Sequence, residues 1–292
     1  MNILLLGKNG QLGWELQRSL VPLGAVTALG HAEADLAQPG QVAALVRAQR
    51  PDVIVNAAAW TAVDQAESEQ DAARLVNAIT PAAIAHEAAR LGALLVHYST
   101  DYVFDGSGER PWREEDTPAP LSVYGATKLE GEQAIQQSGC RHLILRTSWV
   151  YAARGGNFAK TMLRLGSERE RLTVIDDQWG APTGAELLAD VTAHAIRHLR
   201  HHPEAAGLYH CAAAGATTWH AYASHVIDQA RCLRPDLPIK AADVAPVPSS
   251  AFATAARRPH NSRLDCSKLQ AAFGLTLPPW QQGVERMLAE IL

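Results

Sequence analysis

Residues 3–13 read ILLLGKNGQLG, an apolar run of strand length followed by glycines at three-residue spacing. Leu12, Leu16 and Leu20 then recur at helical spacing, so the glycines stand between a predicted strand and a predicted helix. Glycine lets a backbone turn sharply and approach a pyrophosphate, and a helix N-terminus supplies amide hydrogens and positive potential. A glycine turn alone can be only a turn, but this context at the start of the chain favours dinucleotide binding.

The alternation of strand and helix continues through the first half of the chain. Further apolar runs of strand length lie at Ala25–Leu29, Asp52–Asn56, Leu94–Ser99 and His142–Arg146. Helical patterns fill the intervals, including one at Val42–Gln49 and one that we expect to start with Thr80 as its cap and to stop at Gly92. Repeated strand–helix units predict an α/β fold of the Rossmann type, a doubly wound parallel sheet with helices on both faces.

The second half of the chain is expected to be less regular. Helices are predicted at Ala159–Leu165, Ala185–Leu199, Trp219–Arg231 and Trp280–Leu292, and one strand at Leu172–Ile175. Residues Val244–Ser249 read as a proline-rich connector. We expect residues 1–150 to form the dinucleotide-binding domain and residues 151–292 to form mainly a smaller substrate-binding region, with segments that fold back onto the sheet.

Composition narrows the class of protein. The 292 residues are 47% hydrophobic, which suits a large core, and the net charge of −4 implies no nucleic-acid partner. The opening residues read as a strand rather than a signal peptide, and no apolar run approaches a membrane span. Four scattered cysteines argue against a zinc cluster or a disulfide framework: Cys140, Cys211, Cys232 and Cys266. We therefore expect a cytoplasmic protein in a reducing compartment.

The stretch from Tyr98 to Lys128 carries the candidate chemistry. It reads STDYVF from Ser99 and, after a polar loop, YGATK from Tyr124, so a tyrosine and a lysine stand one helical turn apart. A phenol has a pKa of about 10, and we expect the nearby ammonium to lower it. With the hydroxyl of Thr100 beside it, Tyr124 would be a general acid for an oxygen that receives a hydride. Such pairs are also common on helix surfaces, and the dinucleotide motif upstream favours the catalytic interpretation.

The region after the second strand bears on the choice of cofactor. An acidic residue there usually holds the adenosine ribose, but this sequence has Gly30-His31. No carboxylate at that place would repel a 2′-phosphate, so we expect NADPH to be accepted as well as NADH. Asp35 and Leu36 follow and either border the adenine pocket or belong to an ordinary loop.

Three other segments are candidates for shaping the site. Asn56–Ala59 ends a strand in small residues, which would let a flat cofactor lie close. The loop Asp105–Ser122 is rich in glycine, proline and charge, and we expect it to cover the mouth of the pocket. An arginine of Arg257–Ser262 would meet a substrate phosphate, or this segment is a plain surface loop.

Taken together, the motifs resemble a known family. Their order along the chain is the glycine motif at 7–13, Asn56–Ala59 with Thr61–Asp64, Ser99–Phe104, Tyr124 with Lys128, Arg146–Tyr151, Asp177–Thr183 and Arg258–Leu264. This combination is similar to the extended short-chain dehydrogenases and, more narrowly, to the dTDP-4-dehydrorhamnose reductases. The resemblance runs nearly from end to end; no single motif would establish it.

The resemblance implies a reaction and roles for its residues. Members of that family reduce the 4-keto group of dTDP-4-dehydro-L-rhamnose to give dTDP-L-rhamnose, a step toward lipopolysaccharide and O-antigen sugars. By analogy Tyr124 would donate the proton, Lys128 would lower the pKa of Tyr124 and hold the nicotinamide ribose, and Thr100 would bond the reacting oxygen. Either NADPH or NADH would supply the hydride.

The same resemblance places the ligands on particular residues. The expected cofactor-binding positions are Gly7, Gly10, Gln11, Leu12, Gly13, Asp35, Leu36, Ala59, Trp60, Thr61, Tyr124 and Lys128. The expected substrate-binding positions are Val63, Thr100, Asp101, Tyr102 and Trp149. Glu15 and Glu186 match positions implicated in a magnesium-linked homodimer of enteric members, although two carboxylates do not complete a magnesium site.

Two kinds of rival remain open. The first is another nucleotide-sugar enzyme on this fold, such as an epimerase, a dehydratase or a different reductase. A dehydratase needs a second carboxylate after the threonine, and here Asp101 is followed by Tyr102, which favours simple reduction. The second is a non-catalytic dinucleotide-binding regulatory subunit, like that of methionine adenosyltransferase. The intact Thr100, Tyr124 and Lys128 favour catalysis.

Overall fold

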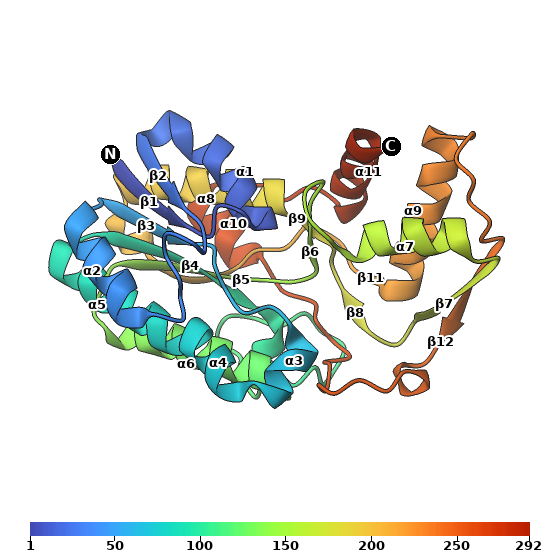
Figure 1. The fold of residues 1–292 in the computed structure, drawn as a ribbon, viewed down its shortest axis with the longest axis horizontal. Helices are drawn as coiled ribbons and strands as arrows, with labels where there is room; N and C mark the ends of the chain where they lie inside the picture. Colours follow the sequence, from blue (N-terminus) through green and yellow to red (C-terminus); the bar gives the residue numbers. More distant parts are fainter.

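A six-stranded sheet lies at the centre of the larger of two bodies in the computed structural model, which describes residues 1–292 (left in Figure 1). Its strands are β1 Asn2–Leu6, β2 Ala25–Leu29, β3 Val53–Asn56, β4 Leu94–Thr100, β5 His142–Thr147 and β10 Gly207–His210. All neighbours are parallel, in the order β2-β1-β3-β4-β5-β10. From β1 the chain adds β2 on one side and β3, β4 and β5 on the other, so the direction in which strands are added reverses between β1 and β3. This is the arrangement of doubly wound folds, and the predicted fold class is confirmed.

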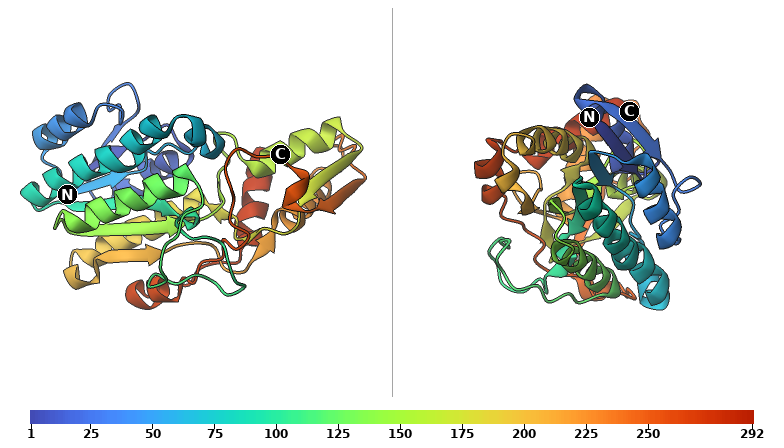
Figure 2. Two further views of the ribbon diagram at one scale, coloured as in Figure 1. Left: turned by 90° about the horizontal axis from the view of Figure 1, so that it is seen from below. Right: turned by 90° about the vertical axis from the view of Figure 1, so that its left-hand side faces the viewer.

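Helices cover both faces of this sheet, which explains why its strands are apolar throughout (Figure 2). One face carries α1 Gln11–Leu20, α8 Ala185–Leu199 and α10 Ser267–Phe273. The other carries α2 Pro39–Gln49, α5 Thr80–Leu91 and α6 Val123–Gln137. Successive side chains of β1 alternate between the two cores, with Ile3 and Leu5 in the first and Leu4 and Leu6 in the second.

A smaller body lies at the other end of the molecule, on the right in Figure 1. It consists of α7 Phe158–Glu168, α9 Trp219–Leu233 and α11 Trp280–Ile291 with the parallel pair β7 Arg171–Ile175 and β12 Asp243–Val247. These elements share a separate apolar core. The second half of the chain also returns to the large sheet through α8, β10 and α10.

Short elements connect the two bodies and the ends of the strands. The paired strands are β6 Val150–Tyr151 with β9 Thr183–Gly184 and β8 Trp179–Gly180 with β11 Thr217–Thr218. The short helical segments are η1 Val21–Leu23, α3 Val63–Ser68, α4 Gln70–Arg74, η2 Leu75–Ile79, η3 Asp101–Val103, η4 Pro203–Ala205 and η5 Ser249–Ala251. None of the helices is both long enough and apolar enough to traverse a lipid bilayer.

Two local predictions are wrong. The expected connector Val244–Ser249 lies largely in β12, where Pro246 is tolerated because the strand has a partner on one side only. Thr80 does not cap a helix start, because the π-helical turn η2 runs directly into α5 and both Ile79 and Thr80 have helical backbone angles. Its hydroxyl instead donates to the Leu36 carbonyl at 2.5 Å. Gly92 ends α5 in the left-handed conformation, as predicted.

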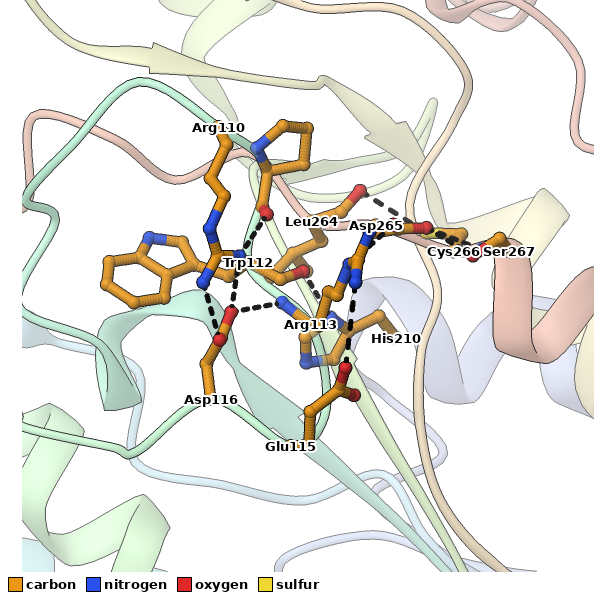
Figure 3. Close-up of polar contacts among 11 residues, drawn as sticks. Arg110, Trp112, Arg113, Glu115, Asp116, His210, Leu264, Asp265, Cys266 and Ser267 are labelled. Carbon is orange, nitrogen blue, oxygen red and sulfur yellow. Dashed lines mark hydrogen bonds and ion pairs between the residues drawn. The ribbon is translucent and has the colours of Figure 1, made fainter.

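The long loop Asp105–Ser122 is held against the segment that precedes α10 (Figure 3). The Trp112 ring stacks on Phe104. The Trp112 backbone N–H donates to the Arg263 carbonyl, and the Trp112 carbonyl accepts from Asp265 N–H at 2.7 Å. The ion pair of Arg110 with Asp116 closes the loop on itself. The loop is thus ordered by contacts with a part of the chain more than 140 residues away.

Candidate active site

The carboxyl ends of the parallel strands bring the predicted site residues to one edge of the sheet. Leu6, Asn56 and His97 are register neighbours on β1, β3 and β4, and Thr100 lies beside Thr147 of β5. The glycine loop, the segment after β3 and the Thr100 turn therefore meet. Ligands of open α/β sheets bind outside such an edge, next to the point where the strand order reverses.

The glycine loop is shaped by close backbone approach. Gly7 has a φ of +90°, and a Cβ atom on it would lie 2.8 Å from the Ala58 amide nitrogen. A Cβ on Gly13 would lie 2.0 Å from the Gly7 carbonyl oxygen. These glycines let α1 start directly above β1, with Gln11 and Leu12 in its first turn. Helix-terminal amides without intrahelical partners are what a pyrophosphate needs, so the loop fits a dinucleotide.

Asn77 positions the segment after β3. Its side-chain oxygen accepts from Trp60 N–H at 2.9 Å, and its side-chain nitrogen donates to the Trp60 carbonyl at 3.1 Å. The same nitrogen lies 3.3 Å from the Thr127 hydroxyl on α6. Asn77 thereby links Ala59–Thr61 to the helix that carries Tyr124. Sequence analysis missed this residue, because a π-helical turn leaves no periodic signal.

Thr100 and Asp101 form the turn at the end of β4. The Thr100 hydroxyl accepts from Tyr102 N–H at 3.1 Å and donates to Asp101 Oδ1 at 3.1 Å. Burial raises the pKa of Asp101 to about 7, against the opposing effect of the nearby Ser262 and Thr100 hydroxyls. Asp101 Oδ2 is buried without a hydrogen-bond partner in the chain. A buried carboxyl oxygen of this kind is a candidate for contact with a ligand.

Tyr124 lies in the first turn of α6, where the Ser122 hydroxyl caps the helix by accepting from Gly125 N–H. A Cβ on Gly125 would lie 2.1 Å from the Tyr102 carbonyl oxygen, so glycine lets this turn pack against η3. The Tyr124 ring meets the Tyr102 ring edge-on at 5.7 Å. Burial raises the pKa of Tyr124 to about 12, and the neighbouring Thr100 hydroxyl opposes this rise.

Lys128 follows one turn later and is buried against the sheet. Its ammonium donates to the Tyr98 carbonyl at 2.6 Å and lies 3.3 Å from His97 Nε2. Burial lowers the pKa of Lys128 to about 8. The expectation that Lys128 lowers the pKa of Tyr124 is not met within the chain, because the ammonium is turned toward β4 and burial dominates the phenol.

Lys128 is supported by two buried polar side chains, His97 and Asn56, whose role sequence analysis missed. His97 Nδ1 lies 3.2 Å from Asn56 Nδ2, and the Asn56 side-chain oxygen accepts from Ala58 N–H. His97 and Asn56 are both fully buried. The sequence did contain a signal for this contact, since His97 is a polar residue inside the otherwise apolar run that leads into Tyr98. These contacts fix the lysine relative to the loop that follows β3.

The predicted substrate residue Val63 begins α3, which is joined to a distant segment. The Asp64 carboxylate accepts from Arg258 Nη2 at 2.6 Å and from Ala256 N–H at 3.0 Å. The Arg258 guanidinium stands beside the Tyr102 hydroxyl, and its Nη1 is buried without a partner. The structure thus places Arg258 at the site, where sequence analysis had left a phosphate contact and a surface loop as alternatives.

Trp149 comes two residues after Thr147 and joins the aromatic cluster of the smaller body. Its ring stacks on Trp219 at 3.6 Å, and a Cβ on Gly180 would lie 2.5 Å from the indole. Its φ of +47° is rare for a bulky residue, and such strain persists only where the surroundings enforce it. The two bodies therefore meet through Trp149 close to the Thr100 turn.

The outer part of the predicted cofactor site is the turn after β2. Leu36 is buried and Asp35 Oδ1 accepts from Ala37 N–H, so both stabilise the turn after β2. Glu33 Oε2 accepts from Gly30 N–H at 2.9 Å, and Glu33 Oε1 pairs with the Lys8 ammonium. The interpretation that no carboxylate stands there is wrong, because the turn Gly30–Ala34 folds Glu33 back onto the strand end.

Glu15 and Glu186 lie together on α1 and α8, away from Tyr124, and line a small surface cavity with Glu290. Glu15 is 3.6 Å from Arg18, and Glu186 is 3.4 Å from Arg286. Within one chain, no group of three or more histidine, cysteine or acidic side chains has the arrangement of a metal site.

Comparison with known proteins covers the whole chain. Residues 1–292 match the family model described as RmlD substrate binding domain. The chain is similar to a dTDP-4-dehydrorhamnose reductase of Escherichia coli (strain K12), with 58% identity over 100% of this chain and 98% of that protein. A dTDP-4-dehydrorhamnose reductase of Shigella flexneri is 59% identical over the same shares.

A solved structure shows a similar fold. The crystal structure of dTDP-4-dehydrorhamnose reductase from Bacillus anthracis in complex with NADP superimposes with a TM-score of 0.89. The two sequences are 36% identical, and the match covers 99% of each chain.

Proposed function

The chain belongs to the dTDP-4-dehydrorhamnose reductase family, and from this premise we propose that Tyr124, Lys128 and Thr100 carry its reaction. It is an oxidoreductase that reduces the keto group of a nucleotide-linked sugar with a nicotinamide cofactor. For this chain we propose dTDP-4-dehydro-L-rhamnose as substrate and dTDP-L-rhamnose as product. The observation that carries the assignment of residues is the meeting of Thr100 with Tyr124, since Tyr124 sits on α6 and Thr100 at the end of β4.

The nicotinamide, when bound, supplies the hydride that reaches C4 of the sugar. As negative charge develops on the C4 oxygen, Tyr124 donates its phenolic proton to that oxygen. A phenol with a pKa of about 12 is fully protonated at neutral pH, so the acid form is present before each turnover. Thr100 rotates its hydroxyl from Asp101 Oδ1 toward the same oxygen and stabilises the charge by a second hydrogen bond.

Lys128 has a positioning and electrostatic role in this proposal. Its ammonium holds the Tyr98 carbonyl, which leaves further donors for the nicotinamide ribose. In this proposal the ammonium lowers the pKa of Tyr124 once cofactor and substrate are bound, and it thereby stabilises the phenolate that proton transfer leaves. In the chain alone, burial dominates the pKa of the phenol.

Buried polar atoms support the proposed sugar-nucleotide site. Asp101 Oδ2 would accept from a sugar hydroxyl, and Arg258 Nη1 would donate to a diphosphate oxygen. Val63, Tyr102 and Trp149 would complete the wall around the sugar. The glycine loop from Gly7 would hold the cofactor pyrophosphate, with Ala59–Thr61 beside the nicotinamide end. In this proposal residues 1–150 bind mainly the cofactor and residues 151–292 mainly the substrate.

The direct test is the absorbance decay of NADPH or NADH with purified protein and dTDP-4-dehydro-L-rhamnose made in place by the upstream enzymes. Oxidation that depends on the sugar is expected with both cofactors. Protein that binds either cofactor but oxidises neither would point to another nucleotide sugar or to a regulatory subunit. The Tyr124→Phe protein in the same assay separates enzymatic turnover from background oxidation.

We also propose a cytoplasmic homodimer in which Mg²⁺ lies between the subunits. Burial raises the pKa of Glu186 against the opposing effect of Arg286, and Glu15 and Glu290 add to the rise, so the cavity disfavours negative charge even with one guanidinium beside it. The carboxylates of one chain are too few for magnesium, and a second copy would double them. Light scattering with and without EDTA tests this proposal. A protein that is a monomer with and without EDTA would contradict the magnesium link. So would a dimer that EDTA does not dissociate, if the wild type and Glu15→Gln behave alike.

A further inference from the structure

The carboxyl end of β2 carries a pair of opposite charges from two different loops. The Lys8 ammonium, in the glycine loop, contacts Glu33 Oε1, while Glu33 Oε2 accepts from Gly30 N–H. The two loops are also joined through the backbone, because Gly7 and Lys8 N–H both donate to the Leu29 carbonyl. The pair therefore lies between the pyrophosphate loop and the strand end.

Side chains of neighbouring residues occupy the space beside Gly30. A Cβ on Gly30 would lie 2.6 Å from Asn9 Nδ2 and 3.2 Å from Glu33 Oε2. An acidic residue at position 30 would thus have to displace the flexible ends of the Asn9 and Glu33 side chains. Glu33, three residues farther along, supplies a carboxylate at the same place.

In a dinucleotide fold this place faces the adenosine ribose, where NADH has a 2′-hydroxyl and NADPH a 2′-phosphate. A carboxylate accepts a hydrogen bond from the hydroxyl and repels the phosphate, whereas an ammonium attracts the phosphate. We propose that the Lys8–Glu33 pair determines the preference between the two cofactors, with Glu33 selecting for NADH and Lys8 for NADPH. The inference rests on the proposed function and adds the residues that set its cofactor preference.

The pair can serve both cofactors because it remains accessible. The side chains are 28% exposed for Lys8 and 45% for Glu33. An exposed ion pair is weak, so a 2′-phosphate can draw the ammonium away from Glu33 at little cost. Since the two charges offset each other, we expect the wild-type dissociation constants for NADH and NADPH to agree within about tenfold.

The test measures binding rather than turnover, by titrating each protein with NADPH and with NADH and following nicotinamide fluorescence. Glu33→Gln is expected to tighten NADPH binding by about tenfold and to weaken NADH binding by a few-fold. Lys8→Gln is expected to weaken NADPH binding by about tenfold and to leave NADH binding nearly unchanged. The two variants therefore shift the ratio of the dissociation constants in opposite directions.

Glu168→Gln is the matched control, since Glu168 also forms an exposed ion pair, with Arg164 on the distant α7. It should leave both dissociation constants unchanged. A ratio that stays at the wild-type value in both Glu33→Gln and Lys8→Gln would overturn the inference. Failure of the wild type to bind either cofactor would instead refute the proposed function, so the two failures are distinguishable. If Glu33→Gln does not fold, as thermal melting would show, Lys8→Gln alone still decides the outcome.

Discussion

The two ends of the proposed cofactor site are built in opposite ways. At the reacting end, Thr100 and Lys128 are buried, and burial shifts the pKa of both Tyr124 and Lys128. At the adenosine end, Lys8 and Glu33 form an ion pair in contact with water. The same sheet edge thus holds a buried proton donor and an exposed charge pair.

The difference follows from what each end must do. A proton donor needs a fixed protonation state and a fixed geometry, and both are obtained by removing water and adding hydrogen bonds. Distinguishing a phosphate from a hydroxyl needs only a charge difference, which exposed side chains supply at small energies. We therefore expect substitutions at the reacting end to have large effects and those at the adenosine end to have small ones.

The largest effect is expected for Tyr124→Phe. Loss of the positioned acid should lower kcat by roughly two to four orders of magnitude while NADPH still binds. Turnover and cofactor fluorescence measure the two quantities separately. Tyr209→Phe is the control, because Tyr209 lies on the edge strand β10 and its phenol donates to the Ala205 carbonyl. Unchanged turnover in Tyr124→Phe would remove Tyr124 from the role of acid.

Lys128→Ala should affect binding and chemistry together. The lysine is expected to contact the nicotinamide ribose and to stabilise the phenolate, so both the dissociation constant of NADPH and kcat should worsen by about tenfold or more. The measurement is a fluorescence titration beside steady-state kinetics. A loss of kcat with unchanged cofactor binding would argue against the ribose contact and would make the role of Lys128 purely electrostatic.

The burial of Asp101 at the reacting end can be tested by measuring how the free energy of unfolding depends on pH. Its pKa rises from 3.8 to about 7, so the folded protein binds this proton more tightly than the unfolded chain. The carboxylate therefore destabilises the fold increasingly as pH rises from about 4 to about 7. Asp101→Asn should raise the free energy of unfolding at pH 8 by at most about 4 kcal/mol and should give no such gain near pH 4.

Urea unfolding at both pH values checks this prediction. Asp228→Asn, an exposed carboxylate on α9, should change the free energy by less than about 0.5 kcal/mol at either pH. An equal effect of Asp101→Asn at the two pH values would show that the carboxyl group is not buried in the way the structure indicates.

The smallest effect concerns salt at the adenosine end. The tighter NADPH binding of Glu33→Gln should shrink to a few-fold when KCl rises from about 50 mM to about 500 mM, because exposed charges are screened. The wild type should respond less, since the charges of Lys8 and Glu33 offset each other. A gain that does not depend on salt would indicate a contact shielded from water and would weaken the comparison between the two ends.

Much of the fold could be read from local pattern. The strand Ala25–Leu29 and the helix Ala185–Leu199 have the predicted bounds, because apolar runs and helical spacing reflect burial along one element. Prediction was wrong at Thr80, where a π-helical turn precedes the helix, and at β12, where a proline hides an edge strand. In both places a contact with a distant segment outweighs the local signal.

The candidate site divides in the same way. The motif residues Thr100, Tyr124 and Lys128 could be found from sequence, since parallel strands deliver their carboxyl ends to one edge. His97 and Asn77 could not, and Arg258 was left between a phosphate contact and a surface loop, because each acts through a partner far along the chain. Glu33 was missed although it lies only three residues after Gly30, since a turn rather than the strand presents it.

By itself the sequence determined the strands, the helices and the order of the chemical motifs, because these depend on neighbours within a few residues. The tertiary structure alone decided where the side chains of those motifs point. It turned the ammonium of Lys128 toward Tyr98 and His97, and it placed Glu33 against Lys8. Periodicity records which face of an element is buried, whereas the partner of a polar atom is fixed only when distant segments pack together.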